Sequence, residues 1–599
     1  MASKSTLTNR ESPFGKFELK DRRAVATRTS YVSVQYFHYE KQNFGIPTNC
    51  KTADEIEKIE TTNQLKTITG TIEAEVLSMN VNKSIGQTAA SFELQLTPSQ
   101  NWKKILAPGD WIIIYMFDDF GTDDRTKDTA SNKDIILIGN IDRVARVLSK
   151  DQESDKIQLR YQVSGRNFGK VFEDSDIWFD PYSVQVEFLD RVTLPSAGLN
   201  IQGSPDYLVQ NLMNVFLGPG GIADNAKTSP LGNWKISPTF ANVFKTLFLS
   251  PSNFAAESGL FGPGDVISMR NQDFAALSDF ADSPDTKFYD IMKFAIDEKL
   301  PGFKARHVFT LESNGSLGDL MRSSCNSLVN ELYFEEVRGP NGVFPTVVLK
   351  PRPVQTPFFE DTFGEEGGAA YLSTIGDNHQ TLQDAANTNF VEVSQAEIKY
   401  ENLGKDEHSR FNLFFFKDVK HVEDHLSIVA NLSDKRGIAN PLFLGASIER
   451  NGLKRMEQIF EFTMTSSISG NQEVVVGGPQ VNLFKAFVAQ LYDMNAYNHL
   501  YDAGTIECSG VLEAELGKVL VLKADPQFGG LDKIYYIEGY EHQWKFPGQW
   551  TTTFTVTHGQ WKTIPGDKKI FIDATADDQG QDDVILNNAY IAKTFSGKK

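Results

Sequence analysis

Two histidines, His421 and His425, have the spacing at which a helix would place both imidazoles on one face. Zinc proteases use this spacing, but they need a glutamate directly after the first histidine, and Val422 occupies that position. No third ligand is identifiable in the sequence. We therefore interpret the pair as solvated polar side chains and expect no metal site.

Other residues that could do chemistry also lack the context that the chemistry needs. The acidic run 118–124 does not alternate around a glycine as calcium loops require, so we interpret it as a solvated loop. The glycines of residues 218–223 and 262–265 are not flanked by a strand and a helix in the order that a dinucleotide site requires. No phosphate-binding GxxxxGK[ST] motif and no serine-hydrolase GxSxG motif occurs.

The cysteines and the two histidines near the C-terminal end give no nucleophile. Cys50, Cys325 and Cys508 are far apart and form no CxxC pair, so neither a disulfide framework nor a zinc site is expected. Cys325 lies on the apolar stripe of a predicted helix and is interpreted as core. His542 and His558 fall on two predicted facing strands and are interpreted as barrel side chains. The sequence thus contains no catalytic constellation, and we predict that the protein is not an enzyme.

The N-terminal part of the chain is rich in strand patterns. β-Branched and aromatic residues, alternating in several segments, predict strands at residues 31–39, 67–81, 91–96, 111–117, 134–148 and 156–163. Turn residues separate these segments, among them Pro108-Gly109-Asp110. Six strands over about 130 residues indicate a small antiparallel barrel.

The middle of the chain has mixed patterns. Apolar residues at helical spacing predict helices at 205–217 and 287–300, and Ser316 is the expected N-cap of another helix that carries Leu317, Met321 and Cys325. A hairpin is expected between 332 and 350. Residues 218–285 show little periodicity and read as an irregular insertion.

Strand patterns return after residue 390, with helical stretches expected at 453–460 and 483–499 and a hairpin formed by 533–544 and 550–558. We therefore predict a mainly β protein in which two antiparallel tube-type β-barrel domains flank a mixed α/β insert. The expected segments are an N-terminal arm (1–30), the first barrel (31–180), the insert (181–354), a loop (355–385), the second barrel (386–562) and a C-terminal extension (563–599).

The overall charge narrows the possible partners. The 599 residues include 59 Lys plus Arg and 78 Asp plus Glu, so the formal net charge is −19. Affinity for nucleic-acid backbones comes mainly from Lys and Arg, so general nucleic-acid binding is not expected. The first residues contain no apolar segment typical of a signal peptide, and no apolar run is long enough to span a bilayer.

Three ordered blocks, 91–182, 316–358 and 521–560, together resemble the baseplate hub proteins of contractile phage tails, the family of late-control protein D and the phage T4 hub. The positions that carry the resemblance are Pro108, Gly109, Asp110, Gly139, Gly165, Arg166, Asn167, Arg352, Pro353, Gly539, His542, Trp550 and Gly559. The blocks cover roughly half of the chain. No fused spike or wall-degrading domain is evident, so the spike is expected to be a separate protein.

The resemblance implies a structural protein without cofactors, located in the virion at the tail baseplate. Three copies would form a pseudo-sixfold ring that joins the sixfold tail tube to the threefold central spike. The implied partners are the tube or its initiator, the spike, the baseplate wedge proteins and the tape measure protein. DNA would pass through the lumen without specific binding, and no membrane insertion is expected. The acidity of such a hub is expected to concentrate on the strands that face the lumen.

Other functions stay open at this stage. A hub of a phage-like contractile injection system would share the same features. A tail-associated cell-wall hydrolase would need a catalytic carboxylate, which no motif supports. A receptor-binding tail protein of β-sandwich type would not need the helix and hairpin between the two β regions.

Overall fold

The computed structural model describes slightly less than half of the chain. The described residues are 29–41, 64–119, 134–150, 157–174, 176–177, 200–203, 205–206, 209, 293–296, 304–307, 315–325, 327–339, 342–353, 382–418, 442–443, 445–460, 467–468, 474–475, 491, 494–495, 498–524 and 532–562. His421, His425 and the two glycine segments 218–223 and 262–265 lie outside them.

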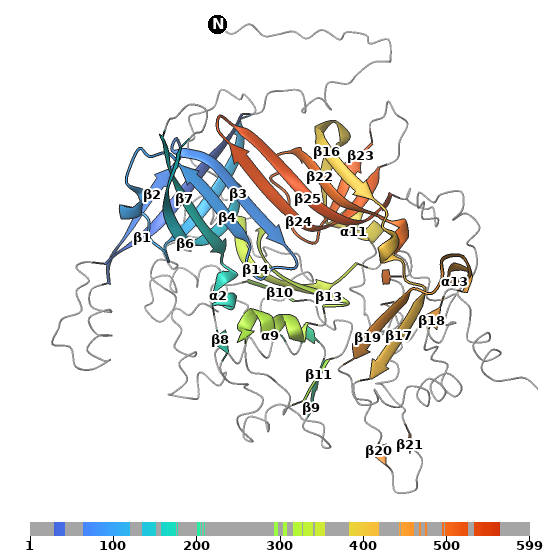
Figure 1. The fold of residues 1–599 in the computed structure, drawn as a ribbon. Helices are drawn as coiled ribbons and strands as arrows, with labels where there is room; N and C mark the ends of the chain where they lie inside the picture. Colours follow the sequence, from blue (N-terminus) through green and yellow to red (C-terminus); the bar gives the residue numbers. More distant parts are fainter. Residues whose placement is uncertain are drawn as a thin grey trace, which may run out of the picture.

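One sheet of 13 strands dominates the described structure (Figure 1). Its main path follows the order β2-β1-β5-β6-β7-β4-β3-β24-β25-β22-β16, and β23 pairs with both β24 and β15. All these pairs are antiparallel except β15 with β23. The strands are β1 (Thr29–Lys41), β2 (Gln64–Ile72), β3 (Val76–Ser84), β4 (Ser91–Leu96), β5 (Trp111–Asp119), β6 (Ile135–Lys150), β7 (Ile157–Asn167), β15 (Phe390–Ser394), β16 (Ile398–Gly404), β22 (Asp502–Ser509), β23 (Val519–Lys523), β24 (Lys533–Lys545) and β25 (Gln549–Trp561).

Alternation of apolar and polar residues explains most of these strands. β4 buries Phe92, Leu94 and Leu96 and exposes the residues between them in whole or in part. β5 instead buries every residue from Trp111 to Met116, because it is covered on both faces. Two apolar clusters lie against the sheet, one under β3 to β7 and the other around β22 to β25.

Smaller elements complete the described structure. The remaining strands are β8 (Asp176–Ile177), β9 (Asn200–Gly203), β10 (Lys293–Ile296), β11 (Lys304–His307), β12 (Gly315–Ser316), β13 (Asn330–Gly339), β14 (Gly342–Pro351), β17 (Leu413–Asp418), β18 (Leu442–Phe443), β19 (Arg455–Phe460), β20 (Ser467–Ile468) and β21 (Val474–Val475). The described helices are α2 (Lys170–Glu173), α9 (Leu317–Ser324), α11 (Leu382–Thr388), α13 (Gly445–Asn451) and the 3-10 turns η2 (Trp102–Lys104), η4 (Gln395–Glu397), η5 (Glu407–Ser409) and η7 (Asn498–Leu500).

The sequence signals for helix α9 are confirmed, whereas the helices predicted at 287–300 and 453–460 are not. Ser316 caps α9 in a capping box with Asp319, as its position predicts, and Cys325 is buried directly after the helix. The helix predicted at 287–300 contains strand β10, which pairs in parallel with β14. The helix predicted at 453–460 is largely strand β19, paired with β17. Both predictions are wrong because short apolar segments fit a helix or a strand, and pairing with a neighbouring strand decides between them.

The protein is mainly β, as predicted, and its described residues contain a large antiparallel sheet and few helices. The two closed barrels of the sequence prediction are not found among the described residues. Their largest sheet is open. Its path ends at β2, paired only with β1, and at β16, paired only with β22. The second half of β24 pairs with β3, which belongs to the N-terminal half of the sheet. Strand β24 therefore does not close a barrel with the C-terminal strands. No helix in the described ranges is long and apolar enough to cross a membrane.

Candidate functional site: the joint between two half-sheets

The large sheet of 13 strands contains two four-stranded units. We call β3, β4, β7 and β6 the first unit, and β16, β22, β25 and β24 the second unit. In each unit the strands lie in this spatial order, and the first two and last two strands form corresponding antiparallel pairs. The two units meet where β24 pairs with β3 (Figure 1).

Both register shifts of the first unit have counterparts in the second unit, which has two more, between Asp502 and Gly504 in β22 and between Ile534 and Tyr536 in β24. In the first strand of each unit a register shift follows the same pairing position, between Val76 and Ser78 in β3 and between Ile398 and Tyr400 in β16. In the last strand a shift lies between Ile141 and Arg143 in β6 and between Ile537 and Gly539 in β24. Shared strand order and shared bulges indicate an internal structural repeat.

Polar side chains cross the joint on one face of the sheet. Gly539 pairs with Ser84, and a Cβ at Gly539 would lie 3.1 Å from the carbonyl oxygen of Lys83, so the backbones are close. Asn80 Nδ2 on β3 donates to Glu541 Oε1 on β24 over 2.6 Å, and Gln543 donates to the same oxygen over 2.9 Å.

Buried charges bridge the joint on the opposite face. Lys83 of β3 is 2% exposed, and its Nζ lies 2.6 Å from Glu336 Oε2 and 4.0 Å from Glu335 Oε1. Both glutamates lie on β13, in the three-stranded sheet β10-β14-β13. Tyr540 of β24 donates its hydroxyl to Glu335 Oε1 over 2.6 Å. Strand β13 therefore holds both strands of the joint through one charged cluster.

Strand β13 also bonds the main chain of both units or their immediate neighbours. Glu336 Oε1 accepts from the backbone N–H of Ile138 in β6, and Glu335 Oε2 accepts from that of Leu516, just before β23. Tyr333 donates to the carbonyl oxygen of Leu516, and Arg338 donates to that of Ile135. These bonds fix the two units relative to β13.

Burial sets the ionisation of this cluster. Desolvation raises the pKa of Glu335 to about 7, although Lys83 opposes the shift. Desolvation lowers the pKa of His542 well below its usual value, and the positive charge of Lys83 lowers it further. His542 is neutral at pH 7, lies edge-on to the rings of Tyr540 and Trp550, and shares a hydrogen bond with Thr552 Oγ1. Its role here is packing within the joint.

The positions singled out by the sequence resemblance form three groups. One surrounds the Pro108-Gly109-Asp110 turn. Gly109 has φ +92°, its carbonyl oxygen accepts from the side chain of Asn140, and its N–H bonds the carbonyl oxygen of Ile141. The Asp110 carboxylate accepts from the Ala107 N–H over 2.7 Å and lies 2.8 Å from His38 Nδ1. The turn thereby anchors β5 against β6.

The same group extends into β6 and β7. The ring of Phe92 packs over Gly139 and Gly165, where an added Cβ would lie 2.7 Å from it in each case. Asn167 is fully buried and accepts from the N–H groups of Ala90 and Gly169. Arg166 forms a half-exposed ion-pair cluster with Asp142, Glu173 and Asp174.

A second group consists of Gly539, His542, Trp550 and Gly559 in the β24–β25 hairpin, close to the joint. The third is Arg352 with Pro353, directly after β14, where Arg352 lies 3.7 Å from Glu331. The structure does not bring the three groups into one site.

Sequence reasoning missed Lys83 and the buried glutamates of β13. The available signal was the segment 330–337 (NELYFEEV), whose adjacent Glu335 and Glu336 must point to opposite faces of a strand. If the strand was covered on both faces, both of them therefore had to enter the protein interior, and both are buried.

The face that carries Asn80 and Glu541 is polar. At the paired positions of the two units it carries mostly Ser, Thr, Asn and Gln, none of them fully buried. Its acidic residues include Glu93, Glu507, Glu541 and, at the β6 bulge, Asp142. Its basic residues include Arg143, Arg160, Arg166 and Lys545. Acidic and basic residues therefore both occur on this face. Within the described ranges no group of three or more His, Cys, Asp or Glu residues could hold a metal ion.

No family profile matches the chain, and no curated protein matches its sequence. Among solved structures it is similar to the 43 kDa tail protein of prophage MuSo2 from Shewanella oneidensis, at 11% identity and TM-score 0.37, over 88% of this chain and 98% of the other. The tail protein of Neisseria meningitidis MC58 gives 10% identity and TM-score 0.35, over 88% and 96%.

A third similar structure is the E. coli c3393 protein, at 9% identity and TM-score 0.28, over 84% of this chain and 76% of the other. It is described as a component of the type VI secretion system that is structurally similar to the T4 tail proteins gp27 and gp5.

Proposed function

We propose that this protein is a structural hub subunit of a contractile phage tail baseplate and that three copies close into a ring. In this proposal the two units are the sheets of two tube-type domains. The single observation that carries it is the internal repeat, because a joint already made once within the chain can be made again between chains.

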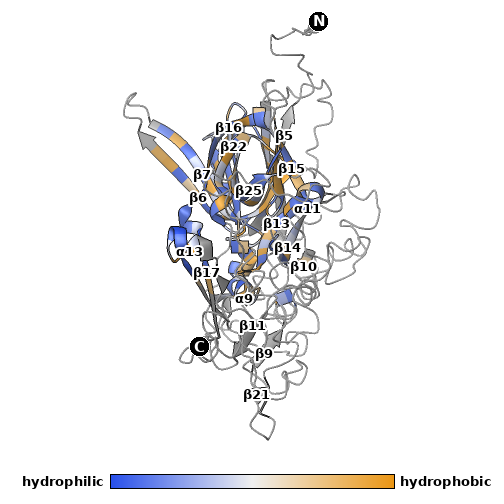
Figure 2. Ribbon diagram, turned by 90° about the vertical axis from the view of Figure 1, so that its right-hand side faces the viewer, coloured by the Kyte–Doolittle hydropathy of each residue, from blue (hydrophilic) through white to orange (hydrophobic). Residues whose placement is uncertain are grey.

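The repeat leaves matching edges open. The first half of β24 pairs with β23 and its second half with β3. In the same way the first half of β6 pairs with β5, whereas residues 142–150 pair only with β7 among the described strands. This part of the β6–β7 hairpin projects from the body (Figure 2). At the other end of the sheet, β16 offers the edge that corresponds to β3. A free strand edge is a template for pairing with another chain.

The internal joint supplies a register for the joint between copies. Gln543 pairs with Asn80 within the chain. The corresponding residues are Val147 in β6 and Asn402 in β16, counted from the bulges of each strand. Three copies joined in this way would place six units of four strands around one axis, which supports a pseudo-sixfold ring.

The polar face would line the lumen of this ring. In this proposal the lumen wall is not strongly acidic, because the polar face carries basic as well as acidic residues. A wall of hydroxyl and amide groups without a basic excess still offers DNA no polyanion-binding surface. The tail tube, the central spike, wedge proteins and the tape measure protein are the proposed partners, at the virion baseplate. The proposal assigns the protein no catalytic activity and no cofactor.

Disulfide trapping tests the ring. Paired residues on neighbouring strands have Cα atoms about 4.5–5.5 Å apart, within the range that a disulfide spans. The double variant Val147→Cys with Asn402→Cys is expected to give covalent dimers and trimers on oxidation, ending at the trimer. The matched control Val147→Cys with Leu403→Cys points the second thiol to the other face and should stay monomeric on a denaturing gel.

Mass measurement and electron microscopy of the unmodified protein complete the test. A trimeric mass and ring-shaped particles are expected. A protein that stays monomeric at high concentration, or a disulfide ladder that continues beyond the trimer, would refute the ring. A hub of a related injection system would give the same ring, and the presence of capsid genes beside its gene separates the two.

A further inference from the structure

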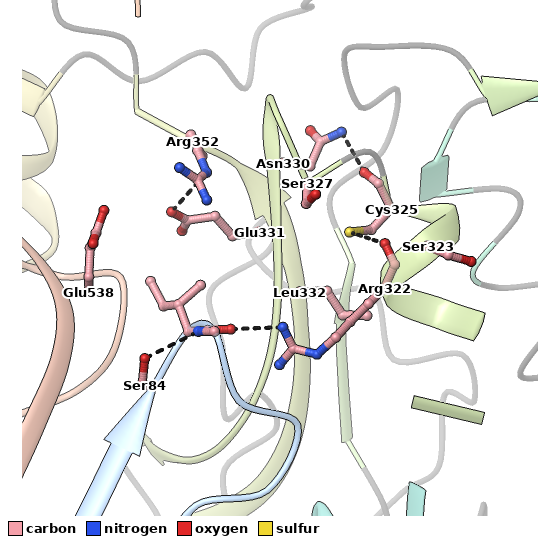
Figure 3. Close-up of a pocket in the computed structure, with 12 residues that line it drawn as sticks. Ser84, Arg322, Ser323, Cys325, Ser327, Asn330, Glu331, Leu332, Arg352 and Glu538 are labelled. Atoms are coloured by element: carbon pink, nitrogen blue, oxygen red, sulfur yellow. Dashed lines mark hydrogen bonds and ion pairs between the residues drawn. The ribbon is translucent and has the colours of Figure 1, made fainter. Parts of the chain in front are cut away.

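A pocket of about 560 Å³ opens where three parts of the chain meet (Figure 3). Its walls come from the turn after β3, from the end of α9 and from the start of β13, with Arg352 and Glu538 on the remaining side. Ser84, Ser323, Ser327 and Asn330 make much of this wall polar.

Arg322 is the residue in this wall that needs explanation. Its Nε donates to Thr88 Oγ1 over 2.9 Å and its Nη1 donates to the carbonyl oxygen of Ile85 over 3.0 Å. Its Nη2 is buried and has no hydrogen-bonding partner among the described residues. Desolvation also lowers the pKa of this guanidinium. A buried charged donor without a partner is costly, and the two bonds to Thr88 and Ile85 hold it in place at the pocket.

A second guanidinium lies in the same wall. Arg352 Nε is buried without a hydrogen bond within the described part of the chain, and its nearest carboxylate oxygen, Glu331 Oε1, is 3.7 Å away. The other oxygen of Glu331 is engaged by the hydroxyl of Tyr536. Figure 3 shows Arg352 beside Glu331, and Arg322 farther to the right beside Ser323. Glu331 and Glu538 are the acidic residues among those that line the pocket, and the carboxylate of Glu538 accepts a hydrogen bond from Thr557.

We propose that this pocket binds an oxyanion, a carboxylate or phosphate group, on the guanidinium of Arg322, with Arg352 as the second positive charge. A guanidinium presents parallel N–H donors that match two oxygens of such a group. A pocket of this volume exceeds the size of one small ion and falls in the range of ligand sites, so the group belongs to a larger molecule. The proposal is independent of the ring and of the baseplate function.

Two probes distinguish the possible sources of the oxyanion. Glutarate carries the carboxylate of an acidic side chain, and inorganic phosphate carries the alternative group. Each is titrated into the full-length protein at constant ionic strength, with chloride as the reference anion, and binding is followed by calorimetry. Saturable binding of glutarate alone assigns the site to an acidic polypeptide side chain, and binding of phosphate alone assigns it to a phosphorylated molecule.

Variants decide whether the site is the one proposed. Arg322→Gln is expected to weaken the bound probe about tenfold or more, because a hydrogen bond to a charged group is lost. Arg322→Lys keeps the positive charge but lacks the planar guanidinium, so it should retain part of the affinity for the probe. This variant keeps the proposal testable if Arg322→Gln fails to fold. Arg160→Gln, on the polar face, is the matched control. Absence of saturable binding for both probes, or unchanged affinity in Arg322→Gln and Arg322→Lys, overturns the proposal.

Discussion

Replacement of Lys83 by methionine tests the joint between the two units. Methionine keeps most of the length of the side chain and removes its charge. Lys83 is 2% exposed, and Glu336 on β13 is its partner at 2.6 Å. After the replacement Glu336 keeps one hydrogen bond, from the N–H of Ile138, but loses its counter-charge inside the protein.

The size of the effect follows from the burial of the pair. Breaking a buried ion pair by removing one partner typically costs about 3–5 kcal/mol. Because Glu336 keeps its hydrogen bond from the N–H of Ile138, we expect a loss in the lower part of this range, about 3–4 kcal/mol.

Hydrogen exchange measures this loss at the joint itself. Peptides covering β3 and β24 report the free energy of local opening where Lys83 acts, whereas global unfolding of so large a chain need not follow a two-state model. The double variant Lys83→Met with Glu336→Gln removes both charges and should recover most of the stability, since neutral replacement of a whole buried pair is often tolerated.

Lys103→Met, at an exposed position of η2, is the matched control and should exchange like the unmodified protein. The reasoning fails if Lys83→Met costs less than about 1 kcal/mol, the ordinary size of an exposed ion pair.

Three further predictions concern the same framework. Gly139→Ala should cost about 1–3 kcal/mol by crowding the ring of Phe92, and the second substitution Phe92→Leu should restore part of the melting temperature. Asn167→Ala leaves two buried N–H donors unpaired at about 1–3 kcal/mol each, whereas Asn82→Ala on the exposed face of β3 should leave thermal unfolding unchanged. Glu335 has a pKa of about 7 when folded and about 4.3 when unfolded, so it binds its proton more tightly in the folded state, and its contribution to stability declines as pH rises from about 4.5 to 7. Melting curves across this window should therefore show Glu335→Gln gaining on the unmodified protein as pH rises, with no further gain above pH 7; parallel curves would contradict the assignment.

The sequence predicted those parts of the fold in which local and tertiary preferences agree. The six predicted N-terminal segments correspond to strands β1 to β7, with 67–81 divided into β2 and β3, and the hairpin at 533–544 and 550–558 is β24 with β25. The helices predicted at residues 287–300 and 453–460 were wrong, because β10 and β19 are strands only through their pairing with β14 and β17. Such pairing depends on residues more than 30 positions away, which periodicity cannot register.

The candidate site was less accessible to sequence reasoning than the fold. The turn at Pro108-Gly109-Asp110 and the glycines under Phe92 carry local signals, and the structure gives each of them a physical role. Lys83 and Glu336, in contrast, are 253 positions apart, and each looks like an ordinary solvated charge in its own segment. Only the crossing of β13 beneath the joint brings them together.

The repeat itself explains why no internal similarity is visible in the sequence. Phe92 of β4 pairs with Gly165 of β7, and the corresponding pair in the second unit is Gly504 with Val556. The large residue has moved to the opposite strand, since an added Cβ at Gly165 would lie 2.1 Å from the carbonyl oxygen of Asn140 and one at Gly504 would lie 2.0 Å from that of Asn402. Each unit thus has its glycine in a different strand, against a different neighbouring backbone: β6 for Gly165 and β16 for Gly504. What the units share is strand order, bulge position and register, and these are the properties that an edge-to-edge joint requires. A joint between copies therefore needs no sequence likeness to the joint within the chain, and its register, Val147 opposite Asn402, is the part of the proposal that disulfide trapping can decide.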